Sequence, residues 1–193
     1  MRIIAGSLKG RRLTPPKDNT SRPTADRARE ALFSILSSRG AIPEGGAVLD
    51  CFAGTGALGL EALSRGAANA TFMELHVSAI SVLKSNISSL GLDAACTVLK
   101  TDATKPPPAP KAFDLVFLDP PYHLGLVVPC LESLLRQGWV GLSATIVVEI
   151  AAAESLDLPP PFQVQDERRY GAAKILIVDR SFSGGNDQLA KLP

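Results

Sequence analysis

The sequence predicts an α/β fold, with a mostly parallel, seven-stranded sheet covered by helices on both faces. The first observation is that short apolar runs alternate with amphipathic stretches from residue 47 onward, with short connections between them. The second is that the last two runs, 162–169 and 174–178, flank Tyr170-Gly171 with no helix between them. We therefore expect an antiparallel pair at one edge of the sheet.

The first 40 residues are expected to lie outside this sheet. Short apolar runs around Gly6 and Gly10 predict a small hairpin within residues 2–13. Residues 14–23 contain three prolines and no periodic pattern, which predicts a loop. Thr24 is then expected to cap a helix whose apolar stripe is formed by Ala28, Ala31, Leu32, Ile35 and Leu36.

The remaining elements follow from the same patterns. The predicted strands are 47–51, 70–74, 95–100, 113–118, 145–150, 162–169 and 174–178. Of the helices between them, the first follows the glycine-rich turn and ends at residue 63, and the next two span 78–90 and 126–137. We divide the chain into a basic extension (1–23), a main domain (24–180) and a polar, glycine-rich tail (181–193) that we expect to be disordered.

Composition narrows the class of protein. Hydrophobic residues make up 46% of the chain and charged residues 20%, as in ordinary soluble proteins. The three cysteines are far apart, which disfavours a disulfide framework and a structural zinc site. The most apolar stretch, 145–153, is short and is interrupted by Glu149, so we expect no membrane span and a cytoplasmic location.

Charge is unevenly distributed along the chain. Residues 1–39 carry nine Lys or Arg against three acidic residues, a net charge of +6, whereas the remainder carries −5. A basic arm on a mildly acidic body favours a polyanionic partner. Chance clustering on a solvated surface is the alternative interpretation.

A glycine-rich turn, residues 50–59, follows the first predicted strand and opens a helix. Open α/β sheets bind ligands at the carboxyl ends of their strands, and a helix start offers free N–H groups there. Gly54, Gly56 and Gly59 satisfy the G-x-G-x-x-G pattern, which is compatible with a dinucleotide.

Acidic residues decide between possible ligands of this turn. Glu74 ends the second strand, where a carboxylate can hold a ribose diol of either NAD or S-adenosylmethionine. Asp50 would repel a pyrophosphate but suits the methionyl ammonium group of S-adenosylmethionine, and Asp102 can accept a hydrogen bond from the adenine amine. The predicted S-adenosylmethionine contacts are Asp50, Phe52, Ala53, Gly54, Gly56, Glu74, Leu75, Asp102 and Ala103.

The tetrad Asp119-Pro120-Pro121-Tyr122 follows the fourth strand. Two prolines fix the backbone, so the Pro120 carbonyl and the Asp119 carboxylate form a rigid pair of acceptors for an –NH2 group. Tyr122 offers a flat face for a base. Two acceptors that hold the amine hydrogens direct the nitrogen lone pair at a methyl group, and the carboxylate stabilises the positive charge that develops. This chemistry needs no metal, and we expect none. The neighbouring His123 could touch substrate, although a solvated loop histidine is favoured.

At this point the chain resembles the RsmD family. The resemblance rests on motifs spread from residue 1 to about residue 180, namely 1–6, 9–12, 22–24, 29–33, 50–66, 117–122 and 168–171. It implies the class I S-adenosylmethionine-dependent methyltransferase fold, which is Rossmann-like, with a small N-terminal hairpin extension (1–23) for RNA and a methyltransferase domain (24–180). Two departures are Ala172-Ala173 after the Tyr-Gly corner and Glu149-Ile150-Ala151 at the end of the fifth strand.

The resemblance also implies the activity. Such enzymes transfer a methyl group to the exocyclic 2-amino group of one guanine in 16S ribosomal RNA, with the 30S particle as substrate and the protein as a monomer. The implied RNA contacts are Arg2, Lys9, Arg11, Arg12, Arg22, Arg27, Arg169 and Tyr170.

Other functions are compatible with parts of the pattern. DNA amino-methyltransferases and protein glutamine methyltransferases carry similar tetrads, but a DNA enzyme usually needs a larger region to read and flip a base. An NAD-dependent oxidoreductase would need a pyrophosphate site and a proton donor, and we expect no Tyr-x-x-x-Lys dyad in this chain. A non-catalytic RNA-binding assembly factor is disfavoured because Asp50, Glu74, Asp102 and Asp119 occur together.

Overall fold

The structure is a computed structural model that describes residues 1–15 and 23–180, with side chains in the first helix from residue 27 onward. Arg22, most of the predicted loop 14–23 and the tail 181–193 therefore lie outside the described residues. The helices are α1 (Pro23–Ser38), α2 (Ala57–Ser64), α3 (Val77–Leu90), the 3-10 turn η1 (Asp93–Ala95) and α4 (Val127–Arg136). The strands are β1 (Ala47–Cys51), β2 (Asn69–Glu74), β3 (Cys96–Lys100), β4 (Phe113–Leu118), β5 (Val140–Ala151), β6 (Phe162–Tyr170) and β7 (Ala173–Arg180).

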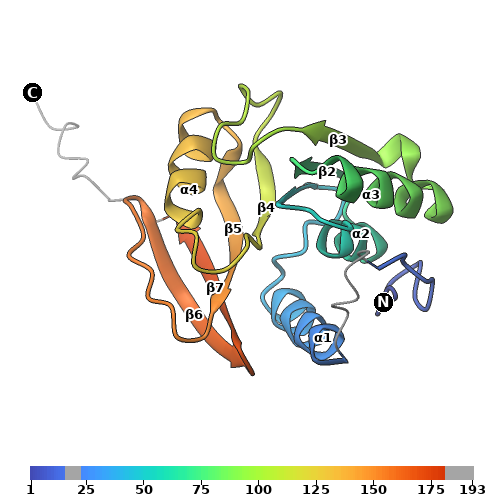
Figure 1. Ribbon diagram of the computed structural model, residues 1–193, viewed down its shortest axis with the longest axis horizontal. Helices are drawn as coiled ribbons and strands as arrows, with labels where there is room; N and C mark the ends of the chain where they lie inside the picture. The colour runs from blue at the N-terminus through green and yellow to red at the C-terminus, as the bar shows by residue number, and fades with distance from the viewer. Residues whose placement is uncertain (16–22, 181–193) are drawn as a thin grey trace, which may run out of the picture.

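One seven-stranded sheet forms the centre of the molecule (Figure 1). Its strand order is β3-β2-β1-β4-β5-β7-β6, and β7 runs antiparallel to both of its neighbours while the other pairs are parallel. The predicted sheet and its antiparallel edge are thereby confirmed. The chain leaves β1 toward β2 and β3 on one side and returns to β4 on the other, so strand order reverses between β1 and β4. That reversal is the place where open α/β sheets bind ligands.

Most element boundaries lie within two residues of the predicted ones, and β5 and α1 differ in ways that have a physical reason. β5 begins at Val140, five residues before the predicted start, and its register against β4 shifts between Phe113 and Leu115. The Gly-Leu-Ser stretch in this shifted segment has no strand-like pattern, so the sequence gives no sign of it. The helix expected to begin with Thr24 as its cap already includes Pro23, a residue that suits the first helical position because that position needs no N–H donor.

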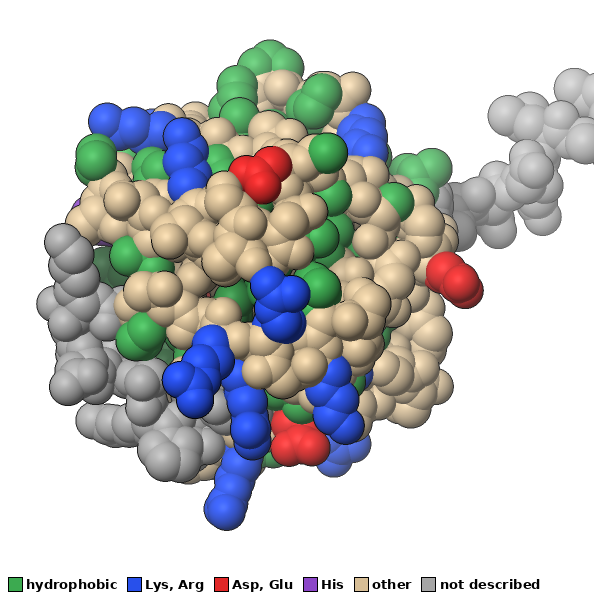
Figure 2. Space-filling view, turned by 90° about the vertical axis from the view of Figure 1, so that its right-hand side faces the viewer, with side chains coloured by type: hydrophobic (Ala, Val, Ile, Leu, Met, Phe, Trp, Pro, Cys, Tyr) green, Lys and Arg blue, Asp and Glu red, His purple; other side chains and the backbone are tan. Residues whose placement is uncertain are grey.

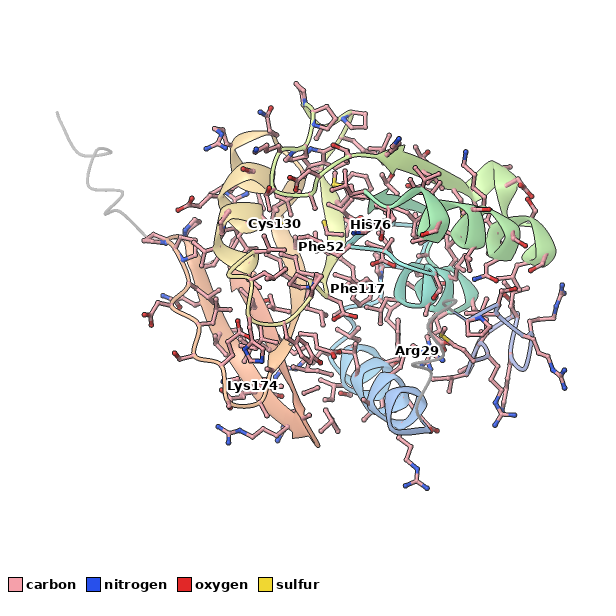
Figure 3. All side chains as sticks on the ribbon, viewed as in Figure 1. Arg29, Phe52, His76, Phe117, Cys130 and Lys174 are labelled. Atoms are coloured by element: carbon pink, nitrogen blue, oxygen red, sulfur yellow. The ribbon has the colours of Figure 1, made fainter. Side chains whose placement is uncertain are left out.

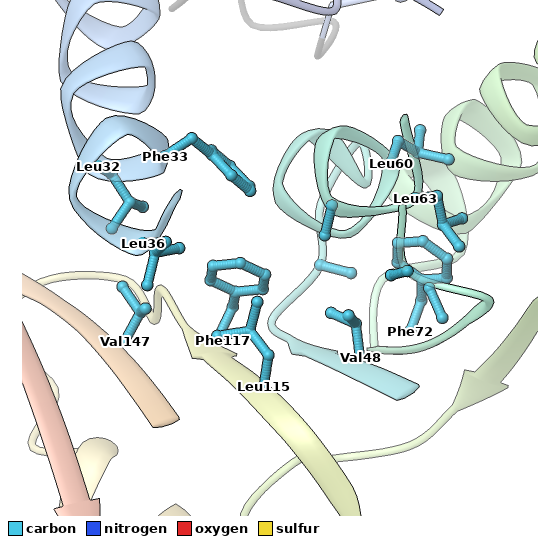
Figure 4. Close-up of a cluster of buried hydrophobic side chains, with 14 of the residues drawn as sticks. Leu32, Phe33, Leu36, Val48, Leu60, Leu63, Phe72, Leu115, Phe117 and Val147 are labelled. Atoms are coloured by element: carbon cyan, nitrogen blue, oxygen red, sulfur yellow. The ribbon is translucent and has the colours of Figure 1, made fainter. Parts of the chain in front are cut away.

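Apolar side chains cover both faces of the sheet. On one face, α1, α2 and α3 pack on β1, β2 and β4, and Leu32, Phe33 and Leu36 of α1 meet Phe117 and Val147 (Figure 4). On the other face, α4 buries Leu131 and Leu134 against the sheet. Alternate residues of each strand belong to the two clusters, as the two-residue period of a strand requires. No helix in the described ranges is long and apolar enough to cross a membrane.

The N-terminal arm, defined here as residues 1–15, folds back on itself. Arg2 and Arg12 form an antiparallel bridge, and the Ile3 amide donates to the Arg11 carbonyl at 2.9 Å. The expected hairpin is therefore present as one bridged turn without two extended strands. Ile3 and Leu13 are 1% and 3% exposed, so the arm contributes to the first apolar cluster.

Buried polar side chains of α2 and α3 anchor this arm. Glu61, which is fully buried, accepts hydrogen bonds from the amides of Ile4 at 2.7 Å and Ala5 at 3.0 Å. Asn86 of α3, 1% exposed, accepts from the Thr14 amide at 2.8 Å and donates to the Thr14 carbonyl at 3.2 Å. The same amide group donates to the Thr55 carbonyl in the glycine turn at 3.0 Å. One side chain therefore joins the arm to the turn.

Replacing Gly6 with alanine is expected to loosen the arm. A Cβ there would lie 1.8 Å from the Ser64 carbonyl oxygen, and Gly6 also has a φ of +84°. Gly10 is a matched control, because its φ is +82° but a Cβ would meet nothing within 4 Å. We expect Gly10→Ala to cost about 1 kcal/mol of unfolding free energy and Gly6→Ala about 1–3 kcal/mol more. Denaturant unfolding measures both, and equal losses would contradict the contact argument.

Candidate functional site

Three carboxylates lie at the carboxyl ends of three adjacent strands. Asp50 is paired with Phe117 across β1 and β4, and Leu118 is paired with Val148 across β4 and β5, so Asp119 and Glu149 follow as neighbours. Side chains two residues apart in a strand point to the same face of the sheet. Val48, Phe117 and Val147 face α1 and α2. Each carboxylate follows one of them by two residues, so all three carboxylates lie on that face. The sheet register alone therefore gathers three acids at the switch point.

A cavity of about 950 Å³ opens at this place. Its walls come from the arm, from α1, from the turn between β1 and α2, from the start of α3 and from the corner between β6 and β7. Figure 3 shows Arg29, Phe52 and His76, which line it from three of these elements. Of the predicted site residues, those that line the cavity are Asp50, Phe52, Ala53, Gly54, Asp119, Tyr122 and Tyr170.

Gly54 and Gly59 are required in the turn for different structural reasons. Gly54 has a φ of +54° and borders the cavity, and a Cβ there would meet nothing within 4 Å, so its backbone faces open space. Gly59 lets α2 approach the sheet, since a Cβ would lie 2.4 Å from the Phe72 ring. The Gly59 amide donates to Asp50 Oδ2 at 2.9 Å. Phe52 has a φ of +61°, a conformation that costs about 1–3 kcal/mol in a residue other than glycine and that is more frequent at functional sites.

Glu74 and Asp102 organise loops beside the cavity. The Glu74 carboxylate accepts hydrogen bonds from the amides of Gly54, Leu75 and His76, each at 2.8 Å. Asp102 accepts from the amide and hydroxyl of Thr104, and the hydroxyl bond is the main reason that the pKa of Asp102 is lowered. These two acids, Gly56, Leu75 and Ala103 do not line the cavity, and Ala103 is only 3% exposed. Their expected contacts with a ribose and an adenine stay predictions.

The tetrad places Asp119 and Tyr122 at the cavity. Pro120 is buried and Pro121 is exposed beside it, and neither lines the cavity. The Tyr122 phenol donates to Glu149 Oε1 at 2.6 Å, which fixes the ring next to Asp119. The side chain of His123 is 71% exposed, lies 3.8 Å from Glu154, and is not part of the cavity wall. This placement favours the solvated histidine over a substrate contact.

Electrostatics at the cavity favour a cation. Burial raises the pKa of Asp50 to about 7, and the charge of Glu74 adds to this effect. Asp119 is exposed where it borders the cavity, and partial desolvation by the surrounding protein, together with the charges of Glu149 and Asp50, raises its pKa. Desolvation and the bond to Glu149 likewise raise the pKa of Tyr122. A cationic ligand would offset the cost of holding these carboxylates close together.

The model of a protein family described as conserved hypothetical protein 95 matches residues 1–179. The chain belongs to this family. The resemblance to RsmD proteins is confirmed as well: Ribosomal RNA small subunit methyltransferase D of Escherichia coli (strain K12) is 35% identical over 97% of this chain and 93% of that protein. The protein of that name from Haemophilus influenzae is 36% identical, covering 89% of each chain.

Solved structures agree with this family membership. The putative methyltransferase yhhF from Escherichia coli superposes with a TM-score of 0.79 at 34% identity and covers 93% of this chain and 97% of its own. Magnesium protoporphyrin IX methyltransferase from Synechocystis, solved with bound SAM, has a TM-score of 0.61 at 15% identity, over 82% and 80% of the two chains, which speaks for the fold alone. The fold is that of class I S-adenosylmethionine-dependent methyltransferases.

Sequence reasoning missed Glu149 and Arg29 as site residues of this RsmD-family chain. The sequence feature that could have revealed Glu149 is a charged residue that interrupts an apolar strand. In the sheet, this residue follows Val148, which pairs with the residue before the tetrad. Arg29 is 7% exposed, lines the cavity from α1 and donates to the Arg2 carbonyl at 2.8 Å. It therefore connects the cavity wall with the arm.

One expectation was wrong: Tyr170 and Lys174 do have Tyr-x-x-x-Lys spacing. The structure separates them, however. Tyr170 ends β6 at the cavity, whereas Lys174 lies in β7, where its neighbour Ile175 belongs to the first apolar cluster and Leu176 to the second. The Lys174 side chain therefore points to the second face, where its ammonium donates to the Glu154 carbonyl at 2.6 Å. The two residues form no proton-donor dyad.

Most of the predicted RNA contacts are exposed side chains, and Figure 2 shows Lys and Arg side chains on the face that carries the arm. Exposed members are Arg2, Lys9, Arg11 and Arg12 on the arm, Arg27 on α1 and Arg169 on β6. Tyr170 is half-buried at the cavity wall, and Arg22 is outside the described residues. Contact with RNA stays a prediction for all of them.

Replacing Asp50 with asparagine is expected to stabilise the free protein above acidic pH. Because the pKa of Asp50 is raised from 3.8 to about 7 in the folded state, wild-type stability from this group is present below pH 4 and is lost as pH rises toward 7. The advantage of Asp50→Asn should therefore grow from pH 4 to pH 7, by on the order of 2 kcal/mol, and then level off. Thermal unfolding across this range tests it, and parallel curves for the two proteins would refute it.

Proposed function

We propose that this protein is an S-adenosylmethionine-dependent methyltransferase that methylates the exocyclic 2-amino group of a guanine in 16S ribosomal RNA, within the 30S particle. The observation that carries the proposal is the group of three carboxylates at the cavity, with Asp119 beside a glycine turn at the switch point of the sheet. The relatives named Ribosomal RNA small subunit methyltransferase D support ribosomal RNA as the substrate.

The cavity suits S-adenosylmethionine, which supplies an electrophilic methyl group on a sulfonium when bound. Asp50 borders the cavity with a raised pKa and would pair with an ammonium group there. Gly54 leaves open space beside its backbone, and the Glu74 carboxylate holds the Gly54 amide in place. The remaining proposed contacts are Phe52, Ala53, Gly56, Leu75, Asp102 and Ala103.

Asp119 would act on the acceptor amine. Its carboxylate accepts a hydrogen bond from the –NH2 group and draws the nitrogen lone pair toward the methyl carbon as the carbon–sulfur bond breaks. A nitrogen that gains a methyl group must lose a proton, and the raised pKa of Asp119 makes its carboxylate a better base for that proton than an aspartate with the ordinary pKa. Pro120 and Pro121 fix the backbone on which this carboxylate sits.

The charge pattern favours RNA over a small acceptor. Three carboxylates line the cavity, and the arm, which carries exposed arginines and a lysine, contributes Met1 to its wall. Phosphates would be held by the basic arm and the base would enter the cavity. Guanine and the 30S particle as targets come from the RsmD resemblance.

NAD is the ligand of the alternative from a different class. A pyrophosphate would lie against Asp50 and close to Asp119, and Tyr170 and Lys174 point to different faces of the sheet. A DNA amino-methyltransferase shares the chemistry proposed here, and only the nucleic acid offered as substrate separates it from an RNA enzyme.

Two measurements test the proposal. S-adenosylhomocysteine should raise the thermal unfolding temperature and NAD should not; stabilisation by NAD alone would overturn the assignment of the donor. Labelled S-adenosylmethionine should then transfer its methyl group to undermethylated 30S particles, at one guanine mapped by mass spectrometry of the RNA. Transfer to duplex DNA, or to a base other than guanine, would overturn the assignment of the acceptor.

A further inference from the structure

Glu149 stands beside Asp119 at the wall of the cavity. The pairing of Leu118 with Val148 brings the two carboxylates to neighbouring strand ends, on the same face of the sheet. The Tyr122 phenol donates to Glu149 Oε1 at 2.6 Å and thereby orients the carboxylate. A carboxylate offers about four acceptor positions, so one phenol leaves it able to accept further hydrogen bonds.

The chemistry of the bases makes this second acceptor selective. Adenine and cytosine carry an exocyclic amine next to a ring nitrogen that has only a lone pair. Guanine carries its 2-amino group next to N1–H, a donor. An ionised carboxylate can only accept hydrogen bonds, so it matches N1–H and repels a ring lone pair. Two adjacent carboxylates therefore fit the donor–donor edge of guanine and of no other amine-bearing RNA base.

We propose that Glu149 is a specificity-determining residue that accepts the N1–H of guanine while Asp119 holds the 2-amino group. The inference rests on the proposed function, because it assigns a role within the same site. Two donors of one base would satisfy two carboxylates that otherwise repel each other. Desolvation is the main reason that the pKa of Asp119 is raised, and the charge of Glu149 raises it further, as this repulsion requires.

2-Aminopurine provides a sharp test, because it keeps the 2-amino group of guanine but has a lone pair at N1. The substrates are 30S particles reconstituted with 16S RNA that carries guanine or 2-aminopurine at the mapped position. Single-turnover transfer of labelled methyl groups is measured on both. We expect wild-type protein to prefer guanine by about 10- to 100-fold, the discrimination that one well-placed hydrogen-bond pair gives.

Glu149→Gln should reduce this preference to about threefold or less, because a carboxamide can turn its NH2 group toward the N1 lone pair. 2-Aminopurine also lacks the guanine O6, but that difference is the same for both proteins, so the change in preference reports on N1 alone. Glu149→Asp keeps a carboxylate and should keep the preference at a lower rate. Glu132→Gln, an exposed change on α4, is the matched control and should behave as wild type.

Several outcomes would overturn the inference: equal wild-type rates on both bases, an undiminished preference in Glu149→Gln, or a preference lost in Glu149→Asp. Thermal unfolding and S-adenosylhomocysteine binding show whether each variant is folded. If Glu149→Gln is not folded, the preference of Glu149→Asp for guanine over 2-aminopurine tests the inference. If wild-type protein transfers no methyl group to guanine at all, the proposed function fails instead, and that result is distinct from every outcome above.

Discussion

Replacing Asp119 with alanine is expected to abolish methyl transfer while S-adenosylmethionine binding stays largely intact. Asp119 lines the cavity with Tyr122 and Glu149 on the side that we propose for the acceptor, whereas the glycine turn and Asp50 line the side that we propose for the donor. In the proposed mechanism, the variant loses both the hydrogen bond that orients the amine and the base that removes its proton. We expect the transfer rate to fall by at least about 10³-fold, and a labelled-methyl assay at saturating donor measures this.

Asp119→Asn is the matched variant for this experiment. Its carboxamide oxygen still accepts a hydrogen bond from the amine, but the group cannot take up a proton or stabilise positive charge. We expect it to retain partial activity between those of wild type and alanine. Calorimetric titration with S-adenosylhomocysteine checks that donor binding is kept. Turnover of Asp119→Ala close to the wild-type rate would refute the role of the tetrad.

Reversing the charge of Arg11 and Arg12 to glutamate is expected to give the second large effect, a loss of affinity for the 30S particle. Both side chains are exposed on the arm. Each phosphate contact that is lost should lower the slope of log affinity against log salt by about 0.7–0.9, so two lost contacts should flatten it by about 1.5. Binding measured from low to moderate salt tests this.

The control for the arm must carry the same change of charge elsewhere. Lys105→Glu with Arg136→Glu meets this requirement, since both side chains are exposed outside the arm, and Arg136 ends α4 on the opposite face of the sheet. The Arg11 guanidinium also donates to the Ser89 carbonyl, so unfolding curves must show that the arm variant is folded. An unchanged salt slope in the arm variant, or an equal change in the control, would contradict the arm as an RNA contact.

Sequence patterns were sufficient for the sheet and for much of the site. Alternating strands and helices give the parallel order, and a carboxylate directly after a buried strand, as in Asp119, must lie at the ligand-binding edge. Register across strands is a tertiary property, however. The position of Glu149 beside Asp119 depends on the shifted pairing of β4 and β5, and no local pattern shows it.

The anchoring of the arm was also beyond sequence reasoning. Glu61 is an acidic residue within a short helix, a pattern typical of a solvated position, yet it is fully buried under the amides of Ile4 and Ala5. The spacing of Tyr170 and Lys174 misleads in the opposite direction, because strand alternation sends the two side chains to different faces. Whether such a side chain is buried, and which face of the sheet it occupies, depends on contacts between residues far apart in the sequence. These contacts exist only in the folded chain.

The side chain of Asn86 links the N-terminal arm to the glycine turn. Its side chain bonds Thr14 in the arm and Thr55 in the turn, so the two segments share one hydrogen-bonding group. If RNA bound to the arm alters the affinity for the methyl donor, thermodynamic reciprocity requires that the donor alters the affinity for RNA by the same factor. In that case, the concentration of methyl donor would influence how long the protein stays bound to its RNA substrate.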